Sequence, residues 1–367
     1  FNPISRKGIW ALNYLANFSR ANRRMHNKSF TIDNQLSIVG GRNIAVEYFQ
    51  LDSSGEFIDF DVIAAGPIVR DISDSFDAYW NHELAVPMNA FYESVDPGEQ
   101  AQFRQEIERR MEESGHTVYG DAVNKVMMQQ RLNGIADPFI ADARAIIDDP
   151  QKLMKKVSEE QKVVTNEIAA ALDKAEQEIL IYTPYFIPRR KGMELVEKIR
   201  AKGVRIVVVT NSLATNNHTS VHSAYASYRK RLLAAGVELW EARVDAAGQV
   251  QEDGTKSPEN LTLHTKGIMI DRRFSFVGSL NLDPRSFDLN SEMGVMIDSD
   301  EMAAVLADRV TKRLPEMAYK LHLNDDNKIT WHAIIEGRQV IETKDPLTSG
   351  WKRFQAWFLK ILPEGQL

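Results

Sequence analysis

The chain has 367 residues, of which 43% are hydrophobic and 26% are charged, and it contains no low-complexity tract. This length and composition are typical of a globular protein of about two domains. The absence of cysteine excludes disulfides, thiolate catalysis and cysteine-ligated metals, and it fits a reducing compartment. A net charge of −6 gives no general attraction for nucleic acid, and no apolar run reaches the ~20 residues that cross a bilayer. We therefore expect no nucleic-acid partner, and only peripheral contact with any membrane.

The first 28 residues combine basic and large apolar side chains without a single Asp or Glu. Such a mixture suits either an anionic membrane surface or docking against the protein core. The cations are Arg6, Lys7, Arg20, Arg23, Arg24 and Lys28, and the apolar residues among them are Ile9, Trp10, Leu12, Tyr14, Leu15 and Phe18.

The stretch 97–174 is predicted to be mostly helical. Within it, GEQAQFRQEIERRMEESG has the composition of one solvated helix that ends at Gly115. We assign no chemistry to this stretch.

Strands and helices alternate from residue 178 onward. Strands are predicted over 178–188, 204–210, 237–242, 263–271 and 274–280, and helices over 192–202 and 220–235. The polar stretch 245–260 is predicted to be a mobile loop. This alternation favours a parallel or mixed sheet layered between helices.

An amphipathic helix is predicted near the end of the chain, in GWKRFQAWFLKIL. Large apolar residues recur there at helical spacing, and the cations lie off that stripe. The pattern suits the interface of an anionic membrane, and docking on the core is the alternative. The stripe consists of Trp351, Phe354, Trp357, Phe358, Ile361 and Leu362, and the cations are Lys352, Arg353 and Lys360.

One motif occurs twice. Residues 25–43 read MHNKSFTIDNQLSIVGGRN and residues 263–281 read LHTKGIMIDRRFSFVGSLN, so both follow H-x-K-x4-D-x6-G-G/S-x-N with an offset of 238 (264 minus 26). At ordinary residue frequencies one chance copy has odds on the order of one in ten thousand, so two copies indicate an internal repeat.

The two copies are preceded by very different lengths of chain. About 90 residues of predicted strands and helices precede the second copy within its half, but only 25 residues precede His26. We expect that the chain lacks the start of its first domain, and a naturally abbreviated first domain is the alternative.

The residue types of the motif suit phosphoryl chemistry. On a strand, His26 and Lys28 point to the same face, as do His264 and Lys266. Lysine, asparagine and serine donate hydrogen bonds to phosphate oxygens, and small residues let a ligand approach the backbone. If the halves face one another, one imidazole can attack a phosphate while the other donates a proton. The donors and small residues that follow each histidine are Asn43, Asn281, Ser279, Gly40, Gly41 and Gly278.

Zinc is the rival chemistry for a histidine pair. His218 and His222 lie four residues apart, as zinc ligands on a helix do, but no HExxH glutamate accompanies them. Lysine does not ligate zinc at neutral pH. We therefore expect neither a metal ion nor another cofactor.

Both motifs are intact HKD signatures, and the chain resembles the phospholipase D superfamily. Further stretches resemble the C-type bacterial cardiolipin synthases, and the resemblance covers nearly the whole chain, weakest over the helical connector. These stretches are GGRNIAVEYF, FDVIAAGP, IYTPYFIP, TNSLATNN, HSAYASYRKRLLAAGVELWE and GSLNLDPRSFDLNSEMG.

The resemblance implies an α/β fold with two phospholipase D-like domains, each a mixed β-sheet flanked by helices and related to the other by pseudo-twofold symmetry. The site would lie in the cleft between them. The implied division is a partial first domain (1–95), a helical connector (96–160), a second domain (161–345) and the amphipathic C-terminal helix (346–367).

The resemblance also implies roles for the motif residues. One histidine becomes phosphatidylated while the other acts as acid and then as base, and family usage points to His26 as nucleophile and His264 as acid/base. Matching by pattern, a downstream carboxylate orients each histidine: Glu292 for His264, and Asp59, or alternatively Asp61, for His26. The charge on the phosphoryl oxygens would be stabilised by Lys28, Lys266, Asn43 and Asn281. Asp33 and Asp271 would support local structure more than contact substrate.

The implied activity is cardiolipin synthesis, in which a phosphatidyl group passes to phosphatidylglycerol from a second phospholipid, for which phosphatidylethanolamine is a candidate. The implied location is the cytoplasmic side of the bacterial inner membrane, with attachment through 350–362 and with 1–28 as a second candidate segment. Two alternatives stay open: a phospholipase D or other HKD phosphodiesterase, including a nuclease, and an inactive lipid-binding scaffold. A nuclease should carry a basic cleft, and intact motifs argue against a scaffold.

Overall fold

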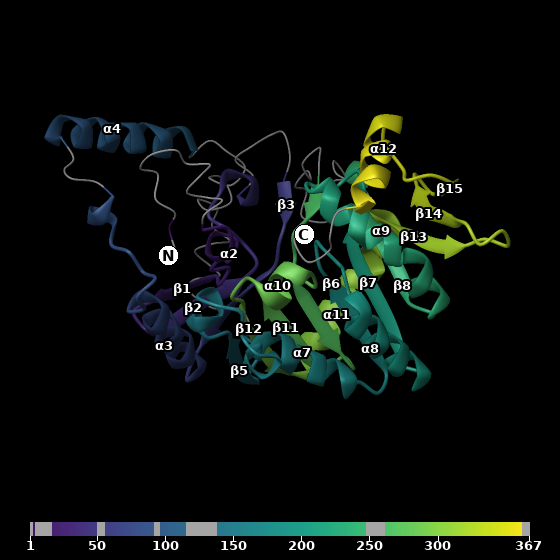
Figure 1. Ribbon diagram of the computed structural model, residues 1–367, viewed down its shortest axis with the longest axis horizontal. Coiled ribbons are helices and arrows are strands. Elements are labelled where there is room, and N and C mark those ends of the chain that lie inside the picture. Colours follow the sequence, from purple (N-terminus) through teal and green to yellow (C-terminus); the bar gives the residue numbers. More distant parts are fainter. Residues whose placement is uncertain are drawn as a thin grey trace.

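The computed structural model describes residues 3, 17–49, 56–91, 96–114, 138–246 and 261–361. Its centre is a ten-stranded mixed sheet with the order β15-β14-β13-β8-β7-β6-β10-β11-β12-β5 (Figure 1). The strands are β5 (Asp142–Ile147), β6 (Glu178–Tyr182), β7 (Arg205–Asn211), β8 (Glu238–Ala242), β10 (Gly267–Ile270), β11 (Phe274–Gly278), β12 (Met293–Asp298), β13 (Ala318–Leu323), β14 (Ile329–Ile335) and β15 (Arg338–Glu342). Within this sheet, only β6, β7 and β8 pair in parallel.

Two small sheets involve the front half of the chain. One is antiparallel with the order β1-β2-β4, and the other is a parallel pair, β3-β9. The strands are β1 (Ser29–Ile32), β2 (Leu36–Gly40), β3 (Glu56–Ile58), β4 (Asp61–Ala65) and β9 (Leu261–Leu263). The pair β3-β9 therefore joins a strand that follows the first motif to a strand that leads into the second motif.

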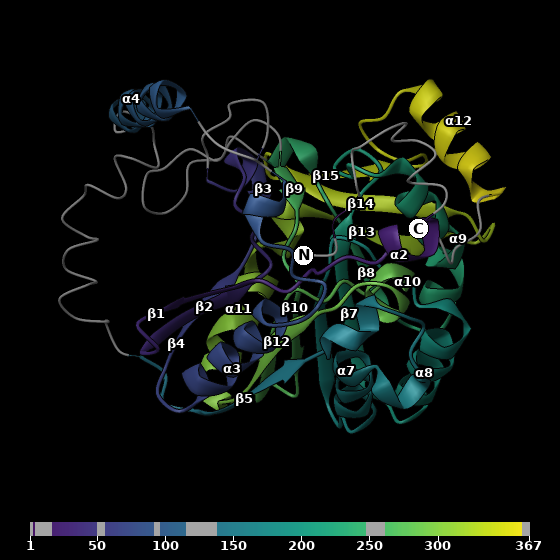
Figure 2. The same ribbon diagram turned by 60° about the vertical axis from the view of Figure 1, so that its left-hand side comes forward.

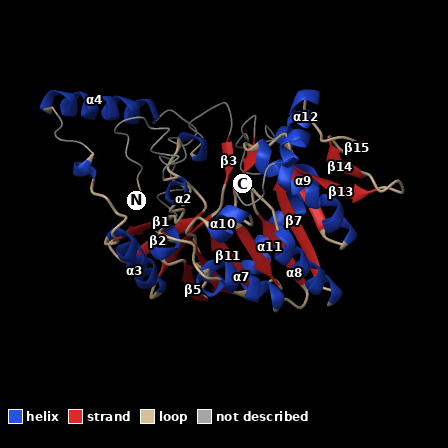
Figure 3. Ribbon diagram, in the orientation of Figure 1, coloured by secondary structure: helices blue, strands red, loops and turns tan. Residues whose placement is uncertain are grey.

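Helices cover the large sheet, which Figure 3 shows as a red band behind α7, α8 and α10. The helices are α2 (Phe18–Ala21), α3 (Ile68–Trp80), α4 (Pro97–Ser114), α7 (Val163–Asp173), α8 (Arg189–Ala201), α9 (Thr219–Ala234), α10 (Pro284–Asp288), α11 (Asp300–Met317) and α12 (Gly350–Phe358). None of the described helices is long and apolar enough to cross a membrane.

The central strands are continuous apolar runs because both of their faces are buried. Alternate residues of β6 serve different layers: Ile179 and Ile181 pack in the core beneath α7 and α8, whereas Leu180 packs on the face covered by α11. At the other end of the sheet, β2, β4 and α3 cover β11 and β12 through apolar residues such as Val39 and Ile72 (Figure 2).

The repeat forms two equivalent hairpins. Ser29 faces Val39 across β1 and β2, and Gly267 faces Val277 across β10 and β11, so the register is the same after the offset of 238 (267 minus 29). The third strands correspond as well, because Gly40 faces Asp61 on β4 and Gly278 faces Gly294 on β12.

Most predicted elements of the back half are confirmed within a few residues, and so is the solvated helix, which is α4. The described part of 97–174 is mostly helical, as predicted, and residues 115–137 lie outside the described residues. The exception is β5, which pairs with β12 at the edge of the large sheet. The predicted strand 263–271 is interrupted between β9 and β10. Residues 247–260 of the predicted loop lie outside the described residues, and the domain division stays a prediction.

Candidate active site

Each motif histidine contacts a carboxylate. His26 Nδ1 lies 2.9 Å from Glu292 Oε2, and His264 Nδ1 lies 2.7 Å from Asp59 Oδ2. The main chain joins the same segments, because His26 N donates to Ser291 O and His264 N donates to Ile58 O. Each histidine is thus held by the segment that precedes the third strand of the opposite hairpin. We call the two contacts, His26 with Glu292 and His264 with Asp59, the crossed clasp.

This crossed arrangement corrects the predicted pairing of Glu292 with His264 and of Asp59 with His26. Asp59 and Glu292 are indeed equivalent, since each lies two residues before the residue that faces Gly40 or Gly278. However, β3 runs beside β9, which leads directly to His264, and Ser291 bridges to Met25 beside His26. The alternative carboxylate, Asp61, instead accepts a hydrogen bond from Arg42 Nε at 2.6 Å.

Glu292 is fully buried and has partners at both oxygens. Ser279 Oγ donates to Oε2 at 2.5 Å and Ser286 Oγ donates to Oε1 at 2.6 Å. Burial alone would raise the pKa of Glu292, but His26, Lys28 and Ser279 together hold it below its ordinary value. Glu292 is therefore an anion fixed in place next to the His26 imidazole.

The clasp around Asp59 is built differently. Asp59 Oδ1 accepts the N–H of Phe60 at 2.9 Å, and Gly41 occupies the position equivalent to Ser279 (279 minus 238). A Cβ on Gly41 would lie 2.5 Å from Asp59 Oδ1, so a serine cannot replace this glycine without moving the carboxylate. The two histidines consequently face unequal carboxylates.

The two motif lysines lie close to the main chain of their histidines. Lys28 Nζ donates to His26 O at 2.9 Å, and Lys266 Nζ donates to His264 O at 2.5 Å. Burial lowers the pKa of Lys28 to about 8 and that of Lys266, which is 1% exposed, to about 7. These poorly hydrated cations are suited to stabilise charge on a phosphate that reaches the imidazoles.

The imidazole of His264 has further neighbours that the sequence analysis did not assign. Tyr48 Oη lies 3.1 Å from His264 Nε2 and accepts a hydrogen bond from Asn43 Nδ2 at 2.8 Å, and the Phe57 ring stacks on the imidazole. Burial raises the pKa of Tyr48 to about 12, so the hydroxyl keeps its proton. Since His264 Nδ1 donates to Asp59, Nε2 carries the lone pair and accepts from Tyr48. Tyr48 lay within GGRNIAVEYF, but no spacing rule marked it.

The second motif asparagine, Asn281, is buried beside Ser279. Its side-chain oxygen has no hydrogen-bond partner among the described residues, whereas its main-chain N–H donates to Ser286 Oγ at 3.3 Å. The side-chain oxygen of Asn281 is therefore a buried polar atom of the second motif that no described residue satisfies.

Asp33 and Asp271 lie in the turns of the two hairpins, both with positive φ. The Asp271 carboxylate accepts the N–H groups of residues 176–178, and β10 separates it from His264. The structure therefore gives Asp271 a structural contact, as expected, and keeps both aspartates away from the imidazoles.

A buried ion pair lies behind Glu292. Asp148 Oδ2 accepts from Lys152 Nζ at 2.7 Å and from the main-chain N–H of Glu292 at 3.1 Å. Lys152 Nζ also donates to Ser286 O at 3.0 Å. Sequence reasoning missed this support because it assigned both residues to a helical connector.

The described residues contain no group of three or more His, Cys, Asp or Glu that could hold a metal ion. His222 is buried in α9, where Arg229 Nη2 donates to its Nε2 at 2.8 Å. Burial first, and Arg229 second, lower the pKa of His222 to about 4.

Comparison with known proteins agrees with this geometry. Residues 168–314 match the family model described as cardiolipin synthase, PLD-like domain. Cardiolipin synthase C of Escherichia coli is 35% identical over 99% of this chain and 77% of its own length. The chain belongs to the cardiolipin synthase family. An uncharacterised protein of Helicobacter pylori is 29% identical over the whole of this chain and 72% of its own.

Among solved structures, phosphatidylserine synthase of Haemophilus influenzae superposes with a TM-score of 0.49 at 14% identity, over 81% of this chain and 63% of its own.

The crossed clasp predicts which imidazole responds to which carboxylate. Glu292→Gln removes a negative charge beside His26, so we expect the pKa of His26 to fall and that of His264 to change little. Turnover should slow while the fold stays intact. Nuclear magnetic resonance titration of histidine-labelled protein measures both values, with Asp59→Asn as the reciprocal variant. A shift confined to His264 in Glu292→Gln would overturn the crossed assignment.

The lysines predict the alkaline limb of the pH profile. Lys266, with a pKa of about 7, is charged below that pH and loses its proton above it, and Lys28 follows at about 8. We expect kcat/KM to fall as pH rises above about 7 because the cations that attract the phosphate disappear. In Lys266→Arg the guanidinium stays charged, so the fall should begin at higher pH even if the rate is lower. A wild-type profile that stays flat to about pH 9 would contradict this.

The buried ion pair predicts a large effect on stability. Lys152→Ala removes the cation from the buried Asp148 carboxylate, which should lower the free energy of unfolding by about 3–5 kcal/mol. Urea denaturation followed by circular dichroism measures the change. Lys155→Ala, an exposed neighbour, is the control and should change stability by less than about 0.5 kcal/mol. Equal effects in the two variants would refute the role of the pair.

Proposed function

We propose that this member of the cardiolipin synthase family transfers a phosphatidyl group to phosphatidylglycerol through a covalent phosphatidyl-histidine. The observation that carries the proposal is the crossed clasp, which presents two oriented imidazoles beside the half-buried Lys28 and the buried Lys266. Membership of the family supports phospholipid as the substrate class.

In the first step, His26 Nε2 attacks the phosphorus of the donor lipid and the P–O bond to the head-group alcohol breaks. The His26–Glu292 contact supports this role, because Nδ1–H donation to a carboxylate leaves the Nε2 lone pair free and makes it more basic. His264 supplies the proton to the departing alcohol.

His264 must gain that proton when substrate binds. In the empty site burial lowers the pKa of His264 to about 4, so the imidazole is neutral at pH 7. An anionic phosphate placed beside Nε2 favours the protonated form and raises that pKa. Substrate binding thus favours the protonated form of His264 that acts as the acid.

In the second step, His264 removes the proton from the glycerol hydroxyl of phosphatidylglycerol, whose oxygen attacks phosphorus while the P–N bond to His26 breaks. Lys28, Lys266 and the amides of Asn43 and Asn281 stabilise the charge on the phosphoryl oxygens. One phosphodiester replaces another, so the exchange needs no nucleotide.

Attachment to the membrane is proposed to occur through α12. Trp351 and Trp357 are 66% and 65% exposed, and Phe354, Phe358 and Ile361 are exposed with them. Ala356 faces the protein instead, where Ser223 Oγ donates to its carbonyl, so the aromatic stripe does not dock on the core. Such a face suits the interface of a bilayer. We propose peripheral attachment at the cytoplasmic side of the inner membrane.

Two details of the predicted basic surfaces need correction. Lys352 Nζ donates to Ala214 O at 3.3 Å and so holds α12 to the body, whereas Arg353 donates to Thr348, next to the N-cap of its own helix. At the front of the chain, Arg23 is buried and donates to Lys152 O. Of the other residues in the two predicted surfaces, those from Arg6 to Leu15 and Leu362 lie outside the described residues, whereas Phe18 is 38% exposed.

The decisive experiment supplies the purified protein with phosphatidylglycerol, alone and together with phosphatidylethanolamine labelled in its head group. A synthase yields cardiolipin, whereas a phospholipase D yields only phosphatidic acid, and a scaffold yields neither. Release of labelled ethanolamine together with cardiolipin would identify the donor. Cleavage of DNA without action on lipid would establish the nuclease alternative.

The histidine roles predict different trapping results. His26→Ala and His264→Ala should each lose at least about a hundredfold in turnover, because a positioned acid, base or nucleophile contributes that much or more. Acid quenching of wild type with donor lipid should leave a phosphatidyl adduct on a peptide containing His26. An adduct found only on His264 would exchange the two roles.

The exposed stripe predicts that α12 drives vesicle binding. Replacing Trp351 and Trp357 by serine should weaken binding to phosphatidylglycerol vesicles by at least about tenfold, because each buried side chain contributes roughly 1.5–3 kcal/mol before ordering costs. Hydrolysis of a short soluble phosphodiester should be unchanged. Salt should release the protein only partly, since apolar contacts are not screened. Unchanged flotation of the double variant with vesicles would exclude α12 as the anchor.

A further inference from the structure

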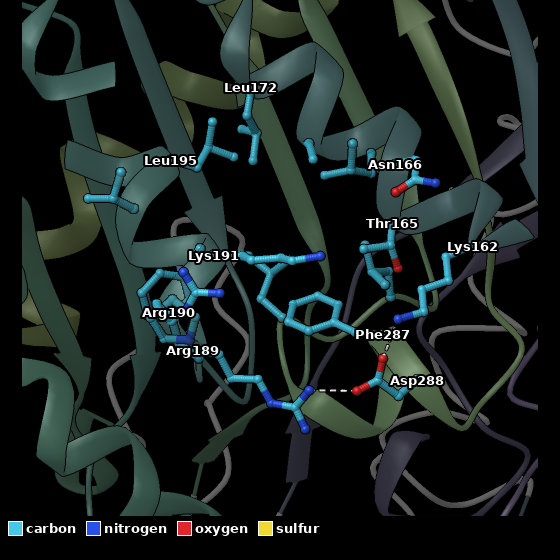
Figure 4. A pocket seen from close by; sticks show the side chains of 18 of the residues that line it. Lys162, Thr165, Asn166, Leu172, Arg189, Arg190, Lys191, Leu195, Phe287 and Asp288 are labelled. Atoms are coloured by element: carbon cyan, nitrogen blue, oxygen red, sulfur yellow. Dashed lines mark hydrogen bonds and ion pairs between the residues drawn. The ribbon is translucent and has the colours of Figure 1, made fainter. Parts of the chain in front are cut away.

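A cavity lies between α7, α8 and the large sheet and beside α10 (Figure 4). Its volume is about 640 Å³, within the range of small-molecule pockets. The inner end is apolar and formed by side chains such as Ile179, Ile199 and Ile206, which are almost fully buried. Protein interiors rarely leave unfilled apolar space of this size, so the cavity is suited to an apolar ligand.

The mouth of this cavity is positively charged. Among its described lining residues, six are Lys or Arg and two, Glu159 and Asp288, are carboxylates. Figure 4 shows Arg189 and Lys162 on either side of Asp288, and both form ion pairs with it. Arg190 at the same rim is 79% exposed and pairs with Glu194 at 2.9 Å, so the six lining cations outnumber the three carboxylates that line the cavity or pair with them. An anionic group at the mouth would therefore be attracted.

The wall of the cavity is the back of the catalytic segment. Leu280 and Leu282 line it and flank Asn281, and Phe287 lines it from α10. Between them, Ser286 donates to Glu292. A ligand in this cavity would thus lie against the residues that position the donor amide and the carboxylate of His26.

We propose that this cavity binds the acceptor phospholipid, with one acyl chain inside and the phosphate at the basic mouth. The inference rests on the proposed function. In the second step the phosphate of phosphatidylglycerol is not the reacting one, so it needs a cationic site separate from Lys28 and Lys266. Its head-group oxygen forms the new P–O bond, the P–N bond to His26 breaks, and the proton passes to His264 Nε2.

A filling variant and a charge variant test the cavity. Leu195→Trp places a large ring into the space from α8, and Arg190→Glu reverses a rim charge without touching the core (Figure 4). We expect each to weaken binding of palmitoyl lysophosphatidylglycerol by about tenfold in calorimetry. Lysophosphatidylcholine lacks the net negative head group, and glycerophosphoglycerol lacks the acyl chain. Wild type should bind both more weakly than it binds palmitoyl lysophosphatidylglycerol. Arg313→Glu, exposed on α11 and outside the cavity, is the control.

Kinetics separate the acceptor from the donor. Both variants should raise the KM for phosphatidylglycerol in cardiolipin formation, while adduct formation from a soluble chromogenic phosphodiester proceeds at the wild-type rate. Equal losses in both half-reactions, or unchanged lysolipid binding in Arg190→Glu, would overturn the proposal. If wild type binds the lysolipid but forms no cardiolipin, the acceptor role fails together with the proposed function. If cardiolipin forms and the variants match wild type, only the cavity proposal fails.

Discussion

The site depends on two hydrogen bonds that cross between the halves of the repeat, from His26 to Glu292 and from His264 to Asp59. A neutral imidazole has one donor and one acceptor, so binding Nδ1–H to a carboxylate decides where the lone pair points. Neither hairpin can do this for its own histidine, because the segment carrying its carboxylate runs beside the other hairpin. Orientation of the reactive nitrogens is therefore a property of the assembled molecule.

More of the surrounding residues support Glu292 than support Asp59. Two serine hydroxyls, the Asp148–Lys152 ion pair and the wall of the apolar cavity all converge on the loop that ends at Glu292. Asp59 has one main-chain donor and a glycine beside it. The better-supported carboxylate faces His26, the proposed nucleophile, whereas His264 has the hydroxyl of Tyr48 at its Nε2. A duplicated motif has thus been given two unequal environments.

Sequence patterns predicted much of this fold because the back-half strands are buried on both faces and their helices have one apolar face. The repeat identified His26, Lys28, His264 and Lys266 directly, since the spacing is itself the signal. The crossed pairing could not be predicted from the sequence. Spacing along the chain favours partners from the same half and gives no information on how the two halves pack together. Tyr48 and Lys152 were missed for a related reason, as their roles arise only from tertiary contacts. The strand β5 was hidden by its position between helices.

The reciprocal exchange of carboxylates also bears on how such a chain could arise. A single half would hold an imidazole without the carboxylate that orients it in the full chain. Two copies related by a twofold axis would complete each other, since Asp59 and Glu292 occupy equivalent positions. Joining the copies in one chain makes completion independent of protein concentration. Once joined, the two halves no longer need the same sequence. Position 279 can therefore be a serine while the equivalent position 41 is a glycine.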